Sequence, residues 1–220
     1  MKNSVYICGD SFCASDLDYV DIKPWHEQID NTTNLSRVCA SNLLISLQVE
    51  RAINDKATAI IVEFTSVTRG EVKFRERTHE DLYDRFYNLI DPDKNTNLSS
   101  YTVLAVEDAF ALTNEQQELL KKYNKEFFDL DLAIHRDKLI IEATLQKLVD
   151  SNIPFKFDQG GFEHPGYGGV GTYFTKYKDY RSKYCLWDYA NTRDLRPYFH
   201  IQDQKVHDMI ADYYNNFIQA

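Results

Sequence analysis

Residues 57–64 read ATAIIVEF, a continuous apolar run of the length of one β-strand. Hydrophobicity that does not alternate along a strand indicates a strand buried on both faces, as in a parallel sheet covered by helices. A similar run, Ser4 to Cys8, lies near the start of the chain, and Ile153 to Phe157 forms a third. Residues 34–40 are expected to form a further strand and loop. The sequence therefore predicts a parallel sheet that contains these segments.

Helical periodicity occurs between and after these strands. Ile45, Val49 and Ile53 recur every four residues, which places them on one helix face. Residues 113–149 predict one long or interrupted helical stretch, and residues 203–219 follow the 3.6-residue period of an amphipathic helix. Because strands and helices alternate along the chain, the sequence predicts an α/β fold with helices on both sides of a parallel sheet.

Length and composition restrict the class of protein further. At about 150 residues per domain, 220 residues predict a single domain spanning residues 1–220, with an insertion around residues 71–113, where the chain is charged and then rich in Asn and Asp. The 25 basic and 34 acidic residues give a net charge of −9, with no basic face suited to nucleic acid. No apolar run approaches the roughly 18 residues of a membrane span, so a cytoplasmic chain without membrane partners is expected.

The four cysteines have neither the density of a disulfide scaffold nor the paired CxxC spacing of a zinc site. Reduced thiols are the expected state. No metal and no other cofactor is predicted.

Polar loops follow the predicted strands. In open α/β sheets, ligands bind beyond the carboxyl ends of the strands, so these loops are expected to converge at one edge. The loops are residues 9–11, 39–42, 65–69 and 158–164.

Ser11 occupies the first of these loops, directly after a buried strand. A serine hydroxyl at a strand end can act as a nucleophile, and backbone N–H groups there can surround an oxyanion. Gly9-Asp10-Ser11 is by itself also a common turn sequence, so the motif alone leaves both interpretations open.

Residues 7–12, ICGDSF, resemble the first block of the SGNH or GDSL hydrolase superfamily. Members of that superfamily are mostly esterases, lipases and carbohydrate deacetylases with a flavodoxin-like, three-layer α/β/α sandwich fold. The resemblance covers most of the chain at low density and implies that Ser11 is the nucleophile. In the second block, residues 34–42, Cys39 or Ala40 stands where the family has a glycine whose N–H helps to form the oxyanion hole.

The third block departs from the family pattern. The superfamily usually has Gly-x-Asn-Asp, with the Asn side chain as an oxyanion donor, whereas this chain has EFTSVTR at residues 63–69. Thr65, Ser66 or Arg69 would have to replace that donor. Loss of one such donor costs roughly a hundredfold to a thousandfold in rate.

The fifth block is commonly Asp-x-x-His-Pro, and residues 197–201, PYFHI, place His200 in the general-base position. His207 then falls at a later family position. The family aspartate is absent, and Asp194 and Asp203 are the nearest substitutes. The position of Asp203 at the start of the last helix favours an N-cap role for it, and His207 can equally be structural.

The resemblance implies cleavage of a small ester, such as an O-acyl group on a carbohydrate or a similar polar substrate. Ser11 and His200 are the expected nucleophile and base, with His207 and Asp203 as further catalytic candidates. The residues expected to line the oxyanion and substrate site are Asp10, Cys39, Ala40, Asn42, Thr65, Arg69 and His164.

Two alternatives remain open from the sequence. One is a catalytically silent module that binds a saccharide or anionic ligand. The other is a different transfer reaction in which Arg69 and the histidines hold an anionic substrate. A stand-alone domain with Asn- and Asp-rich insertions also resembles phage-encoded members of the superfamily.

Overall fold

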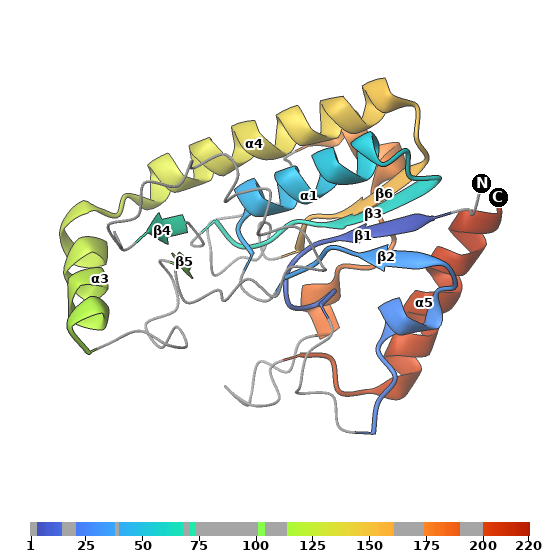
Figure 1. Ribbon diagram of the computed structural model, residues 1–220, viewed down its shortest axis with the longest axis horizontal. Coiled ribbons are helices and arrows are strands. Elements are labelled where there is room, and N and C mark those ends of the chain that lie inside the picture. Colours follow the sequence, from blue (N-terminus) through green and yellow to red (C-terminus); the bar gives the residue numbers. More distant parts are fainter. Residues whose placement is uncertain are drawn as a thin grey trace.

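The computed structural model describes residues 4–14, 21–37, 40–67, 71–73, 101–103, 114–160, 174–189 and 200–220. Its centre is a four-stranded sheet in the order β2-β1-β3-β6, and every neighbouring pair of strands is parallel (Figure 1). The strands are β1 (Val5–Cys8), β2 (Thr32–Asn34), β3 (Ala59–Glu63) and β6 (Phe155–Asp158). The parallel sheet predicted from the continuous apolar runs is therefore confirmed.

The two middle strands are buried along their whole length. Every residue of β1 and of β3 is buried, which explains why neither strand shows the alternation of a half-exposed strand. Alternate side chains point to opposite faces of the sheet: Tyr6 and Cys8 of β1 belong to one apolar cluster, and Val5 and Ile7 to the other. The sheet therefore separates two cores.

Strand β2 begins and ends earlier than the sequence predicts. It covers residues 32–34, whereas a strand followed by a loop was expected within residues 34–40; the Asn34 side chain accepts a hydrogen bond from the Ser36 amide at 3.0 Å, which turns the chain after the strand. The chain still follows β1 for three more residues: the Leu35 amide donates to the Ile7 carbonyl and the Arg37 amide donates to the Gly9 carbonyl.

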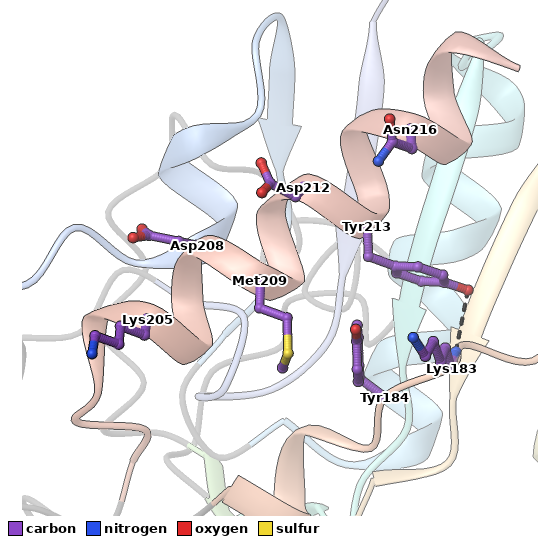
Figure 2. A pocket seen from close by; sticks show the side chains of 8 residues that line it. All are labelled: Lys183, Tyr184, Lys205, Asp208, Met209, Asp212, Tyr213 and Asn216. Carbon is purple, nitrogen blue, oxygen red and sulfur yellow. Dashed lines mark hydrogen bonds between the residues drawn. The ribbon is translucent and has the colours of Figure 1, made fainter.

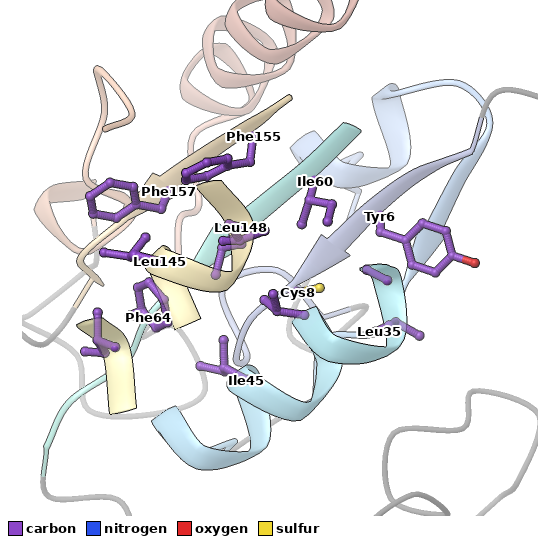
Figure 3. Packing of buried hydrophobic residues seen from close by; sticks show 14 of the residues in the cluster. Tyr6, Cys8, Leu35, Ile45, Ile60, Phe64, Leu145, Leu148, Phe155 and Phe157 are labelled. Atoms are coloured by element: carbon purple, nitrogen blue, oxygen red, sulfur yellow. The ribbon is translucent and has the colours of Figure 1, made fainter. Parts of the chain in front are cut away.

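The helices lie on both faces of the sheet. Helices α1 (Asn42–Asn54) and α4 (Leu130–Ser151) cover one face, and α5 (Gln204–Gln219) with the short 3₁₀ helix η1 (Trp25–Gln28) covers the other (Figure 1). Figure 3 shows Ile45 of α1 and Leu145 of α4 packed over the strands of the first face. The α/β class predicted from the sequence is confirmed.

The predicted helical stretch 113–149 is interrupted. Helix α3 (Asn114–Phe127) ends before Asp129, whose side chain caps α4 by accepting a hydrogen bond from the Leu132 amide at 2.9 Å. The helix predicted at residues 203–219 is confirmed as α5, with Asp203 as its N-cap.

Part of the predicted insertion forms a small ribbon of its own. Strands β4 (Glu71–Lys73) and β5 (Tyr101–Val103) pair antiparallel. The rest of the predicted insertion lies outside the described residues.

None of the helices in the described part of the chain combines the length and the apolar character that a membrane crossing requires.

Candidate functional site

The candidate site lies at the carboxyl ends of β1 and β3. From β1 the chain moves to β2 on one side and then crosses to β3 on the other side of β1. The strand order therefore reverses between β1 and β3, and such a switch point is where open α/β sheets bind ligands. The loops after these two strands do meet: the Thr65 hydroxyl donates a hydrogen bond to Asp10 Oδ2 at 2.7 Å.

Ser11 begins a single helical turn that follows β1. The Asp10 carbonyl accepts hydrogen bonds from the Cys13 and Ala14 amides, at 3.2 and 3.0 Å. Asp10 Oδ1 accepts the Phe12 amide at 2.9 Å, so the carboxylate caps the turn that it precedes. Since these three amides are committed to Asp10, the Ser11 amide is the candidate oxyanion donor in this turn.

Two carboxamides from α1 hold the ends of the strands. Gln48 Oε1 accepts the Gly9 amide at 2.7 Å, and Gln48 Nε2 donates to the Gly9 carbonyl at 3.3 Å. Asn42 holds Thr65 in the same way, with its Oδ1 accepting the Thr65 amide at 2.8 Å and its Nδ2 donating to the Thr65 carbonyl at 2.9 Å. The same helix thus fixes the residues that follow β1 and β3.

These bonds change the expected oxyanion site. Asn42 Nδ2 also donates to Asp137 Oδ2 at 2.7 Å, so both of its amide hydrogens are used within the fold. The Thr65 hydroxyl is directed to Asp10, and the Ala40 amide donates to the Arg37 carbonyl at 3.1 Å. Asn42, Thr65 and Ala40 are therefore structural donors in this arrangement, because buried polar groups are satisfied by one another.

Asp10 has a similar role. It is fully buried, and both carboxylate oxygens accept hydrogen bonds within the protein. It shapes the Ser11 turn rather than facing a substrate. The predicted site residues Cys39, Arg69 and His164 lie outside the described residues.

His200 is brought to the Ser11 turn from a distant part of the chain. Its ring meets the ring of Phe12 edge-on, with centroids 5.1 Å apart and an interplanar angle of 79°. Ser11 and His200 are 5% and 6% exposed, respectively. The structure thus places the expected base against the residue that follows the expected nucleophile.

His207 joins α5 to η1. It is fully buried, its Nδ1 accepts the Trp25 amide at 3.1 Å, and its Nε2 lies 3.0 Å from the Ile201 carbonyl. Because Nδ1 accepts a hydrogen bond, the neutral ring carries its proton on Nε2 and donates it to Ile201. Burial lowers the pKa of His207, which agrees with this neutral form. Both ring nitrogens have structural partners, so the expected role as an alternative base does not fit this geometry.

Asp203 also has a structural role. Its Oδ1 accepts the Lys205 amide at 2.9 Å at the start of α5. The N-cap interpretation is confirmed for this residue.

Two buried carboxyl groups beside Asp10 had no role in the sequence-based site. Glu63 and Asp158 end β3 and β6 and are paired across the sheet. Burial raises the pKa of Glu63 well above its ordinary value, and the neighbouring Asp10 and Asp158 charges raise it further. Cys13 Sγ donates to Glu63 Oε2 at 3.2 Å. For Glu63, the sequence signal was a carboxyl group in the last position of an otherwise apolar strand.

Asp158 is held by backbone amides. It accepts the Leu186 amide at 2.7 Å and the Gly160 amide at 3.0 Å. Burial raises its pKa to about 6, although these hydrogen bonds oppose the shift. Gly160 has a φ of +49°, and a Cβ there would lie 1.9 Å from the Phe64 carbonyl oxygen, so this close approach of β6 to β3 requires glycine.

Within the part of the chain that the structure describes, no group of three or more His, Cys, Asp or Glu side chains could hold a metal ion.

A hollow of about 550 Å³ lies elsewhere, on the outer surface of α5 (Figure 2). Met209 and Tyr213 of α5 line it together with Tyr184, and the Lys183 amide donates to the Tyr213 hydroxyl at 3.2 Å. None of the candidate catalytic residues lines this hollow, so it is distinct from the Ser11 site.

No known protein family, curated protein or solved structure matches this chain. Its function is therefore inferred from its own residues.

Proposed function

We propose that this chain is a serine hydrolase of the SGNH or GDSL kind that cleaves a small ester, such as an O-acyl group on a carbohydrate. The observation that carries the proposal is the contact of the His200 ring with the ring of Phe12, the residue after Ser11, at the switch point of the sheet. Ser11 follows β1, and the His200 ring packs on the adjacent Phe12. The strand order β2-β1-β3, continued by β6, supports a flavodoxin-like three-layer arrangement.

In the proposed reaction, Ser11 Oγ attacks the ester carbonyl carbon while His200 takes the hydroxyl proton. The bond to the leaving alcohol then breaks, and His200 returns the proton to that oxygen. Water, activated by His200, releases the acid from the acyl-serine. The Ser11 amide holds the oxyanion. Asp203 caps α5, and Asp194, the other substitute for the family aspartate, lies outside the described residues, so the proposal assigns catalytic roles to Ser11 and His200.

A second candidate is a catalytically silent binding module on the same fold. One observation favours it: the donors of Asn42, Thr65 and Ala40 are committed within the protein. An acyl-transfer site usually has preorganised donors aimed at the developing oxyanion. A binding module for a saccharide or an anion does not need them.

Covalent labelling separates the two candidates. A hydrolase should react with a fluorophosphonate probe at Ser11 and hydrolyse p-nitrophenyl acetate in assays run from about pH 6 to 9. Ser11→Ala should abolish both signals, whereas Ser46→Ala, which removes a serine hydroxyl from the outer part of α1, should keep them. Failure of both signals in the native chain, with a thermal shift on adding acetylated monosaccharides, would favour the binding module.

A further inference from the structure

Glu63 lies against both ends of the turn that carries Ser11. It ends β3 and follows Val62, which pairs with Cys8 of β1. A Cβ added to Gly9, the residue after Cys8, would lie 3.2 Å from Glu63 Cβ and 2.9 Å from Cys13 Sγ. At the other end of the turn, the Cys13 thiol donates a hydrogen bond to Glu63 Oε2 at 3.2 Å. The Glu63 side chain is therefore placed between the residues that precede and follow the turn.

Glu63 and its neighbour Asp10 differ in how their carboxyl oxygens are bonded. Asp10 accepts the Phe12 amide on Oδ1 and the Thr65 hydroxyl on Oδ2, so both of its oxygens have donors. Glu63 accepts a thiol, which is a weak donor, and its buried Oε1 has no hydrogen-bond partner among the described residues. Hydrogen bonds to the charged form of a carboxyl group favour that form. The bonding therefore favours a charged Asp10 and an uncharged Glu63.

The surroundings of Glu63 also favour its uncharged form. Among the described residues, the titratable groups that face Glu63 or its immediate neighbours are Asp10, Cys13, Asp158, Tyr214, Cys185 and Arg181. The cation in this group, Arg181, interacts with Asp158, and none of the described ion pairs includes Glu63. Burial raises the pKa of Glu63, and the charge of Asp10 raises it further, in agreement with the bonding.

We propose that Glu63 is a positioning residue for Ser11, because as an uncharged acid it allows Asp10 to keep the charge with which it caps the Ser11 turn. Ionised Glu63 would place a second negative charge beside Asp10, and the repulsion would move the Asp10 carboxylate away from the Phe12 amide. The Ser11 turn is therefore ordered while Glu63 holds its proton and loosens when that proton is lost. The consequence for turnover rests on the proposed hydrolase function, whereas the consequence for the turn does not.

Turnover of p-nitrophenyl acetate against pH tests the role of Glu63 in the proposed reaction. In the native chain, turnover should fall on the alkaline side by up to about tenfold per pH unit while circular dichroism shows that the chain stays folded. Glu63→Gln is neutral at every pH, so it should remove this alkaline fall and keep the rise on the acid side, which reports the histidine base. Glu126→Gln, at an exposed position on α3, should keep the native profile. A native profile without an alkaline fall, or a fall that Glu63→Gln retains, would overturn the proposal.

A Cys13→Ala variant separates ionisation of Glu63 from ionisation of the neighbouring thiol. Burial raises the pKa of Glu63, whereas the hydrogen bond from Cys13 lowers it by favouring the charged form. Loss of the thiol should therefore keep the alkaline fall in turnover and move it to higher pH. If Cys13→Ala instead abolishes the fall, the titrating group is the thiol and the assignment to Glu63 is wrong.

The Phe12 amide, which donates to Asp10, reports on the turn without any catalysis. In ¹H–¹⁵N correlation spectra, its signal should change with pH more in the native chain than in Glu63→Gln. The His200 ring that contacts Phe12 is present in both chains, so its own titration contributes equally to both. This difference in a chain that shows no turnover would refute the hydrolase proposal and support the role of Glu63. Equal pH dependence of the Phe12 signal in the two chains would refute the role of Glu63.

Discussion

At the scale of single residues, the site depends on side chains that satisfy the backbone at the ends of the strands. Gln48 is fully buried, and its side chain forms hydrogen bonds with both the amide and the carbonyl of Gly9, the residue before Asp10 and Ser11. A buried peptide group that loses its partner keeps the full cost of its desolvation. Gln48 is therefore a positioning residue for the Ser11 turn.

Gln48→Leu should lower the free energy of unfolding by about 1 to 3 kcal/mol, because it leaves the buried Gly9 amide unsatisfied and leaves the Gly9 carbonyl with the Arg37 amide alone. Urea denaturation followed by circular dichroism measures this change. Gln219→Leu, at the exposed end of α5, should stay within about 0.5 kcal/mol of the native chain. Equal changes in the free energy of unfolding for the two substitutions would contradict a stabilising role of the Gln48 hydrogen bonds to Gly9.

At the scale of elements, both long helices that follow α3 begin at aspartate caps. Asp129 caps α4 and Asp203 caps α5, each by accepting an amide at 2.9 Å. Such caps contribute about 1 kcal/mol each to stability. For Asp203 this role competes with the expectation that it substitutes for the family aspartate beside the histidine base.

Asp203→Ala should lower the unfolding free energy by about 1 kcal/mol, and Asp203→Asn should retain it, since Asn is an equally good N-cap. Both variants should keep fluorophosphonate labelling of Ser11 and turnover of p-nitrophenyl acetate. Asp129→Ala is the matched control for loss of a cap alone. If Asp203 oriented His200 instead, Asp203→Asn would reduce turnover by orders of magnitude without loss of stability.

At the scale of the whole molecule, the buried Glu63 couples folding to pH. Unfolded Glu63 ionises near its ordinary pKa of 4.5, whereas burial beside Asp10 and Asp158 raises the pKa of the folded carboxyl well above that value. Between these two pKa values the folded state holds a proton that the unfolded state has lost. The stability contributed by this group is therefore present at low pH and is lost as pH rises.

Replacing Glu63 with Gln, its neutral amide, isolates the contribution of the Glu63 carboxyl group to the pH dependence of stability. The free energy of unfolding of the native chain minus that of Glu63→Gln should fall as pH rises from about 5 to 8, with a slope of at most about 1.4 kcal/mol per pH unit. Taking the difference cancels the contributions of titrating groups that do not interact with Glu63, such as His26, whose pKa burial lowers to about 4. Glu126→Gln, at an exposed position on α3, should give a difference that does not vary with pH. A pH-independent difference for Glu63→Gln would show that Glu63 is ionised in the folded state.

Local chemistry in the sequence determined the elements of the fold. Continuous apolar runs specified buried parallel strands, four-residue spacing specified the helical faces, and Asp203 signalled the start of α5, because burial, periodicity and capping act over a few residues. The resemblance also led us to expect His200 near Ser11, and the structure places the His200 ring against Phe12, the residue after Ser11.

Only the tertiary structure decided which polar groups are already used. Asn42, Thr65 and Ala40 have the right chemistry for an oxyanion site, and His207 has the right chemistry for a base, but their partners come from distant segments or from backbone carbonyls. The grouping of Asp10, Glu63 and Asp158 likewise arises from strand pairing across the sheet. A donor or a proton is available for chemistry only when the fold leaves it unbonded, and that depends on contacts between residues far apart in the chain.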